Sequence, residues 1–252
     1  MSAAPERIRV GHVGIDRVDF AQALDVIEGL VRARLGGMVF TPNVDHVVLA
    51  EKDERFRAAY RAANLSLVDG TLLLWASRLL GGRLPEKVSG SDLLQPLMQR
   101  TAQCGFRVYL LGGDPGVAEA ARDRLLEQFP ALRVVGCDDS RVDVDALDPA
   151  ILERIKRAAP DLLLVALGAP KQEVFIFEHH AELGSAVCVG IGASLDFVAG
   201  TRRRAPRWIS RIGLEWLYRL LQEPRRLARR YLLRDPLFGW ILTRQLLGSG
   251  AR

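Results

Sequence analysis

The stretch that decides the fold is FRVYLLGGDPGVAEAARDRLLEQF, residues 106–129. It begins with a mostly apolar run, turns at GGDPG (112–116), and continues with apolar residues three and four positions apart. A short apolar run bounded by glycines indicates a buried strand, and the spacing that follows indicates an amphipathic helix. The segment therefore predicts one strand–loop–helix unit, which is the repeating unit of an α/β fold.

The same alternation recurs on both sides of this stretch. Apolar runs that predict strands fall at residues 38–40, 65–68, 106–111, 132–136, 161–167 and 186–191. Patterns that predict helices fall at residues 44–63, 71–80, 117–129 and 173–183. Because the strand runs are apolar throughout, both faces of the sheet are expected to be covered. The sequence predicts an α/β fold: a Rossmann-like, mostly parallel sheet with helices on both faces.

Charge is distributed unevenly over the 252 residues, which carry a net charge of +5. Residues 202–252 contain 13 arginines, no lysine and three acidic residues, a charge of +10, whereas the preceding part has 22 basic and 27 acidic residues. From about Thr201 prolines separate three arginine-rich helical patterns. We therefore expect a Rossmann-like catalytic domain over residues 1–200 and a basic helical appendage over 201–252 that meets a localised anionic partner.

Features of secreted or membrane-spanning chains are not found in the sequence. The beginning, MSAAPERIRV, has no apolar segment after its charges and so does not predict a signal peptide. No uncharged apolar run reaches the roughly 18 residues of a membrane span. The cysteines, Cys104, Cys137 and Cys188, are odd in number and far apart, which argues against a disulfide framework or zinc site and fits a reducing cytoplasm. Cys188 is expected in the core.

Polar residues follow the ends of the expected strands. The loops at these ends are residues 41–43, 69–70, 112–116, 168–172 and 192–194. In open parallel sheets ligands bind beyond the carboxyl ends of the strands. The convergence of these loops on one edge predicts a ligand site.

Asp69 and the glycine turn each allow two interpretations. A carboxylate at the tip of an apolar strand can be partly desolvated and act as a general base. The position just before a helix favours instead an N-cap role for Asp69. The GGDPG turn could present backbone N–H groups to a phosphate, or form a plain tight turn with Pro115 at the helix start. In GAPKQE, Lys171 opposes the helix dipole, which mildly favours contact with a ligand.

Asp143 and Asp145 form a DxD pattern of the kind that holds a divalent cation on a diphosphate. The pair lies in an acidic loop, where such clusters usually only solvate the chain, and no metal site is expected. The four histidines, His12, His46, His179 and His180, lack metal-ligand spacing and are expected at surface or helix-face positions.

Several motifs together resemble one family. They are TPN, LVDG, EKVSGSDL, YLLGGDPGV, PDLLLVALGAPKQE, GIGASLDFVAGTRRRAPRW and GLEWLYRLLQEPRRLARR. Their order and approximate spacing, over about residues 8–235, resemble those of the WecG/TagA/CpsF glycosyltransferases. Each motif is weak alone, whereas the combination is specific.

The resemblance implies a bacterial, inverting, metal-independent transferase without a cofactor. Such enzymes move a sugar, often N-acetylmannosamine, its uronic acid or a related hexose, from a UDP-sugar to a polyprenyl-diphosphate-linked acceptor in wall polymer or surface polysaccharide synthesis. It also implies a peripheral location at the cytoplasmic face of an anionic membrane, with an appendage that helps to complete the site. A homo-oligomer is compatible with the family.

The resemblance assigns the catalytic base to Asp69. Together with the phosphate-binding interpretation of the glycine turn, it gives a substrate-binding set of Thr41, Asn43, Lys87, Gly112, Gly113, Gln172, Asp196, Arg219, Arg226 and Arg229. Lys87 stands where the family usually has arginine, so the charge is kept but the bidentate fork is lost.

Two other classes remain as alternatives. A nucleic-acid-binding protein would explain the basic appendage, but no such fold can be recognised and no nucleic-acid partner is expected. Another nucleotide-binding Rossmann enzyme, such as a nicotinamide-dependent one, requires GxGxxG followed by an acidic residue about 20 positions later, and that pattern is missing.

Overall fold

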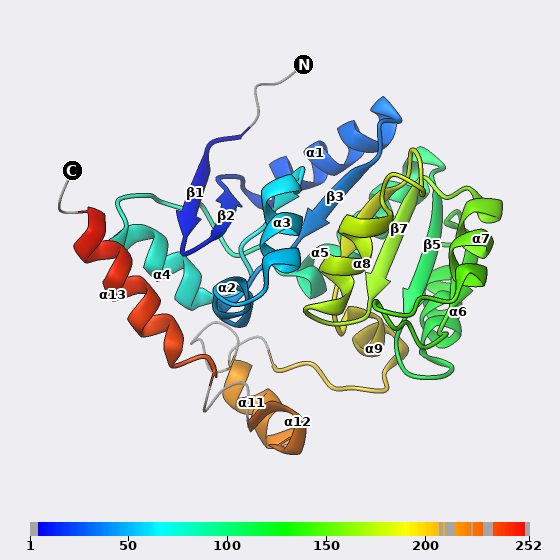
Figure 1. Cartoon of the computed structure of the whole chain (residues 1–252). Coiled ribbons are helices and arrows are strands. Elements are labelled where there is room, and N and C mark those ends of the chain that lie inside the picture. Colours follow the sequence, from blue (N-terminus) through cyan, green and yellow to red (C-terminus); the bar gives the residue numbers. More distant parts are fainter. Residues whose placement is uncertain (1–4, 207–208, 210–214, 223, 229–233, 250–252) are drawn as a thin grey trace.

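The centre of the fold is a six-stranded parallel sheet with the strand order β4-β3-β8-β7-β5-β6 (Figure 1). The strands are β3 (Gly37–Phe40), β4 (Leu65–Ser66), β5 (Arg107–Gly112), β6 (Arg133–Asp138), β7 (Leu162–Ala166) and β8 (Val187–Gly190). The computed structural model describes residues 5–206, 209, 215–222, 224–228 and 234–249, and at 215, 219, 225, 226 and 249 only the backbone. All six expected strands form, and every pairing in the sheet is parallel.

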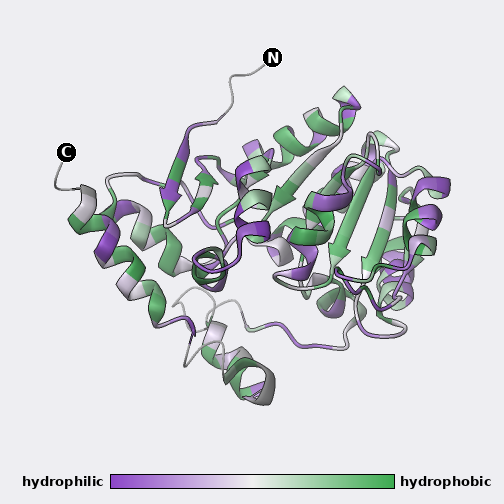
Figure 2. Cartoon of the chain, viewed as in Figure 1, coloured by the Kyte–Doolittle hydropathy of each residue, from purple (hydrophilic) through white to green (hydrophobic). Residues whose placement is uncertain are grey.

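Helices cover both faces of this sheet, as the sequence predicts. They are α1 (Phe20–Ala33), α2 (Val44–Ala50), α3 (Glu54–Ala62), α4 (Thr71–Leu79), α5 (Gly90–Cys104), α6 (Val117–Gln128), α7 (Pro149–Ala158), α8 (Lys171–His179), α9 (Ser194–Ala199), α11 (Glu215–Gln222), α12 (Pro224–Ala228) and α13 (Leu237–Ser249). Hydropathy colouring shows the central strand β7 as apolar along its length, with helices of mixed character around the sheet (Figure 2).

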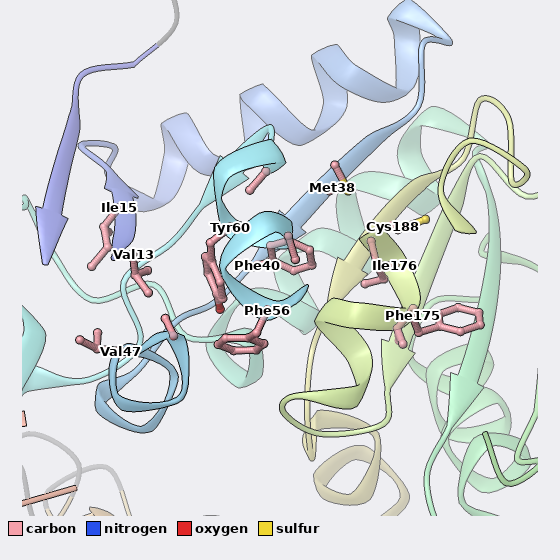
Figure 3. Packing of buried hydrophobic residues seen from close by; sticks show 14 of the residues in the cluster. Val13, Ile15, Met38, Phe40, Val47, Phe56, Tyr60, Phe175, Ile176 and Cys188 are labelled. Atoms are coloured by element: carbon pink, nitrogen blue, oxygen red, sulfur yellow. The ribbon is translucent and has the colours of Figure 1, made fainter. Parts of the chain in front are cut away.

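Two hydrophobic cores result, one on each face of the sheet. Along β7, Leu163 and Val165 belong to the core under α3, α7 and α8, while Leu162 and Leu164 belong to the core under α1, α5, α6 and α9. This alternation follows from the two-residue period of a strand. Figure 3 shows the first core, in which Tyr60 packs among aromatic and aliphatic neighbours. Cys188 is fully buried there, as expected, and burial raises the pKa of its thiol to about 12.

The prediction of one continuous helix over residues 44–63 is wrong. The chain forms two helices, because Asp53 caps a new helix and accepts a hydrogen bond from the backbone N–H of Phe56 at 3.0 Å. A side-chain oxygen that satisfies an unpaired amide of the first turn stabilises such a start. The break ends α2 at Ala50 and lets α3 begin at Glu54, while Asn43 in the loop 41–43 caps the start of α2.

An antiparallel hairpin that the sequence analysis does not predict precedes the sheet. It consists of β1 (Arg7–Val10) and β2 (Val13–Asp16). The buried carboxylate of Asp16 accepts from Arg7 and, at 2.7 Å, from the backbone N–H of Ser66 in β4. This carboxylate therefore ties the hairpin to the edge of the sheet.

The last helix, α13, packs against this hairpin and α2. Phe238 and Ile241 are buried in the same core as α3 and α8. Gln245 accepts from the N–H of Gly11 at 2.7 Å and donates to the carbonyl of Arg9 at 2.9 Å. Among the described helices, none combines the length and apolar character needed to cross a bilayer. The division into two domains near residue 200 stays a prediction.

Candidate active site

Two adjoining cavities open at the carboxyl ends of the sheet strands. The first, of about 160 Å³, is lined by the loops after β3, β4, β7 and β8, by the start of α5 and by Leu227 of α12. Thr41, Asn43, Asp69 and Gln172 all line it. Four residues that the sequence analysis places in the site therefore meet in one cavity.

Asp69 is held at the end of its strand by the backbone. Its N–H donates to the carbonyl of Pro42 at 2.8 Å, which joins the loop after β4 to the loop after β3. The N-cap of α4 is Gly70, with φ +118°, a conformation that favours glycine. The N-cap interpretation of Asp69 is therefore wrong, and its carboxylate lines the cavity instead.

A buried polar chain connects Asn43 to Gln172 along the wall of the first cavity, which His46 also lines. The N–H of Asn43 donates to Nδ1 of His46 at 3.2 Å, and Nε2 of His46 lies 3.3 Å from Oε1 of Glu173. The same oxygen accepts from Nε2 of Gln172 at 2.8 Å, and Oε1 of Gln172 accepts from the N–H of Gly192 at 3.0 Å. These two bonds orient the Gln172 amide, with its nitrogen toward Glu173 and its oxygen toward Gly192.

His46 and Glu173 were missed as functional residues. His46 lies on a face of α2, but a surface position is wrong for it, because the residue is 5% exposed. Glu173 is 0% exposed. Burial of a carboxylate requires a partner, and here the partner comes from a different strand–loop–helix unit. The adjacency of Glu173 to Gln172 in PKQE is the one signal in the sequence.

Tyr60 lies buried near the same carboxylates. Its pKa is raised well above the ordinary value, first by burial and then by the charges of Glu173 and Asp69. The ring packs against Phe40 at 5.3 Å and Phe56 at 5.1 Å between centroids (Figure 3). The Tyr60 hydroxyl therefore stays protonated, and the aromatic side chains around it form an apolar wall behind the polar chain.

The second cavity, of about 220 Å³, shares Gly168, Gly192 and Ala193 with the first. Its other lining includes Gly113, Asp114, Arg141, Lys171, Asp196 and Arg202. Nε of Arg202 lies 3.2 Å from Oδ1 of Asp196, which fixes that carboxylate. Lys171, Arg141 and Arg202 make this cavity suited to an anionic group.

The glycine turn after β5 borders the second cavity through Gly113. At Gly112, with φ +100°, an added Cβ would lie 2.7 Å from the carbonyl oxygen of Ala166, so close packing explains this glycine. The N–H of Gly116 donates to Asp139 at 2.5 Å. A phosphate at this helix start would have to displace that carboxylate, so phosphate binding by the turn stays a prediction.

The remaining predicted residues lie at the margin of the site or beyond the described side chains. Nζ of Lys87 lies 3.5 Å from Oδ2 of Asp92, beside the start of α5 whose Gly90 lines the first cavity. Arg219 and Arg226 belong to α11 and α12, but their side chains lie outside what the structure describes, as does all of Arg229.

The acidic pair in the loop after β6 is tied to a neighbouring helix. Asp145 forms an ion pair with Arg55 at 2.5 Å, and its N–H donates to Asp143 at 3.1 Å. Within the described residues there is no group of three or more His, Cys, Asp or Glu side chains that could hold a metal ion.

The fold, the paired cavities and the sequence together define a glycosyltransferase. Residues 8–252 match the glycosyl transferase WecG/TagA/CpsF family, and the chain belongs to that family.

Two curated relatives carry the name N-acetylglucosaminyldiphosphoundecaprenol N-acetyl-beta-D-mannosaminyltransferase. The protein of Bacillus subtilis (strain 168) is 32% identical over 196 residues, which cover 78% of this chain and 75% of the relative. That of Bacillus spizizenii (strain ATCC 23059 / NRRL B-14472 / W23) is 32% identical over 194 residues, 77% of this chain and 74% of the relative.

Proposed function

We propose that the enzyme transfers N-acetylmannosamine, its uronic acid or a related hexose from a UDP-sugar to a polyprenyl-diphosphate-linked acceptor. The observation that carries the proposal is the meeting of Asp69, Asn43, Thr41 and Gln172 in one cavity at the carboxyl ends of the strands. The names of the two relatives support a mannosamine-type sugar and an undecaprenyl-diphosphate-linked acceptor.

Asp69 is the general base of the proposed reaction. Its carboxylate takes the proton of the acceptor hydroxyl while the oxygen attacks the anomeric carbon of the donor. The bond from that carbon to the UDP oxygen breaks, UDP leaves with the electron pair, and the anomeric configuration inverts. Thr41, Asn43 and Gln172 orient the sugar. Glu173 holds the Gln172 amide, and Nδ1 of His46 lies 2.8 Å from Oδ1 of Asn43.

The departing diphosphate needs positive charge nearby. Because the two cavities adjoin through Gly168 and Gly192, a UDP-sugar can extend from the sugar site at Asp69 into the second cavity. Lys171 and Arg202 there would offset the charge that builds on UDP, and Asp196 would bind the nucleoside. Lys87 and the appendage arginines Arg219, Arg226 and Arg229 would add to this field. These cations would serve in place of a metal ion.

The location we propose is peripheral, at the inner face of the cell membrane. The charge of +10 within residues 202–252 suits anionic headgroups and a lipid-linked diphosphate. The product would enter a wall polymer or a surface polysaccharide.

A panel of donors tests this proposal. The enzyme is incubated with a polyprenyl-diphosphate-linked N-acetylglucosamine and, in turn, UDP-N-acetylmannosamine, its uronic acid and UDP-N-acetylglucosamine. We expect transfer from a mannosamine-type donor, with a product anomer opposite to that of the donor in NMR spectra. Absence of transfer from every UDP-sugar, in a preparation that is folded by circular dichroism, would contradict the proposal.

A further inference from the structure

Helix α4 presents an apolar stripe to solvent. Leu72, Trp75 and Leu79 are 48%, 54% and 63% exposed and lie three and four positions apart, hence on one face of the helix. The other face is buried in the core through Leu73 and Ala76. Three large apolar side chains in a row on a surface indicate contact with another apolar phase.

The stripe belongs to a wider distribution of exposed apolar residues. Among the described residues, eleven large hydrophobic side chains are exposed, and ten of them lie on α4, α11 and α13. The exception is Leu35, which follows α1. Helices α4 and α13 both pack against strand β1 and lie at the same end of the molecule (Figure 1). Seven of the eleven exposed residues, those on α4 and α13, therefore lie at this end of the protein.

Between Asp69 and Glu86, which flank the segment, the charge has a single sign. Residues 70–85 contain no acidic residue, and both of their charged side chains, Arg78 and Arg83, are exposed. Leucine and tryptophan between arginines suit the interface of an anionic bilayer, where the rings lie at headgroup level and arginine meets phosphate. A second copy of the chain fits less well, because a two-fold contact through this stripe would bring arginines together without partners.

We propose that α4, a helix of the catalytic core, is a membrane-contact element whose stripe of Leu72, Trp75 and Leu79 enters the interface of an anionic bilayer. Leu72 is three residues beyond Asp69 and lies in the first turn of α4, which begins at Thr71. The bilayer surface would then lie next to the first cavity. This last step rests on the proposed function: a lipid-linked diphosphate could reach Asp69 from headgroup level while its polyprenyl chain stays in the membrane.

Tryptophan fluorescence tests the insertion itself. Substituting Trp208, Trp216 and Trp240 with Phe leaves Trp75 as the sole tryptophan of the full chain. With vesicles of phosphatidylglycerol and phosphatidylethanolamine, we expect a blue shift of its emission and quenching by lipids brominated near the headgroup. Unchanged emission from protein that sediments with the vesicles would assign binding to other segments and overturn the proposal.

A double variant, Trp75→Ser with Leu79→Ser, tests how much the stripe contributes to membrane binding. Leu35→Ser is the matched control, because Leu35 is 86% exposed and lies outside these helices. We expect at least about tenfold weaker vesicle binding for the double variant, since it removes two large apolar side chains from the interface, and unchanged binding for the control. Turnover of a short-chain, water-soluble acceptor should be equal in both. The vesicles contain neither donor nor acceptor, so the result is independent of the proposed reaction.

Sedimentation velocity tests the alternative that a second copy of the chain, and not a membrane, covers the stripe. A wild-type dimer that the double variant converts to a monomer, with vesicle binding unchanged, would make the stripe a surface of self-association and overturn the membrane assignment. A monomer in both cases, with weakened vesicle binding in the double variant, supports it.

Discussion

Nε2 of His46 lies 3.3 Å from Oε1 of Glu173, a carboxylate with no exposed surface. The two residues come from the helices that follow β3 and β7, and their nearest polar neighbours, Asn43 and Gln172, line the first cavity. The pair therefore joins two loops of the site, and His46 also lines the cavity.

Removing the Glu173 side chain should destabilise the fold. Glu173→Ala leaves the buried amide N–H of Gln172 without its acceptor, and a buried donor without a partner costs about 1–3 kcal/mol. We expect a loss of about that size in urea unfolding. Glu127→Gln, an exposed change on α6, is the control and should shift stability by less than about 0.5 kcal/mol. Equal stability of Glu173→Ala and wild type would refute the positioning role.

Asp92 predicts a pH dependence of stability. Burial opposes its ionisation, but hydrogen bonds from Ser89 and Arg204 and the charge of Lys87 hold its pKa below the ordinary value of 3.8. Because the pKa is lower in the folded state, the stabilisation is present above pH 3.8 and is lost as pH falls through the folded pKa. Asp92→Asn should be less stable than wild type at pH 7, with a smaller difference at pH 3. A difference that is the same at both values would contradict this assignment.

The docking of α13 gives a third prediction. Ile241 is 1% exposed in the core shared with α3 and α8. Ile241→Ala should lower the free energy of unfolding by about 2–5 kcal/mol, the usual range for such a cavity. The exposed neighbour Leu247, 76% exposed, provides the control as Leu247→Ala. Equal effects of the two changes would mean that α13 is not part of the core.

Chelation tests the metal-independent mechanism. We expect turnover to persist in EDTA, because Lys171 and Arg202 provide positive charge in the second cavity. The double variant Asp143→Asn/Asp145→Asn should retain activity within about twofold, since it touches neither cavity lining. Activity lost in EDTA, restored by Mg²⁺ or Mn²⁺ and reduced in the double variant would return the acidic pair to the site.

The sheet could be predicted because its strands are buried on both faces and are therefore continuous apolar runs, as in residues 161–167. The break between α2 and α3 could not, because the apolar spacing continues across it and the capping bond of Asp53 decides it. The hairpin was missed because its strands are short and are buried by contacts from distant segments such as α13.

The position of the site was also predictable, because the loops after the carboxyl ends of parallel strands lie at one edge of the sheet. That is why Thr41, Asn43, Asp69 and Gln172 were found together. Burial of Glu173 was not predictable, because its place beside Gln172 in PKQE does not distinguish a buried glutamate from a solvated one at a helix start. Its environment depends on His46, which the sequence places more than a hundred residues away.

The central claim is that Asp69 is the general base of a glycosyl transfer. The most direct test compares the wild type with Asp69→Asn, which keeps the shape of the side chain and removes its basicity. UDP-sugar and lipid-linked acceptor are supplied at saturation, and UDP affinity is measured by calorimetry. We predict turnover at least about 100-fold slower in Asp69→Asn, with unchanged UDP affinity and thermal stability. Turnover of Asp69→Asn close to the wild-type rate would contradict the account.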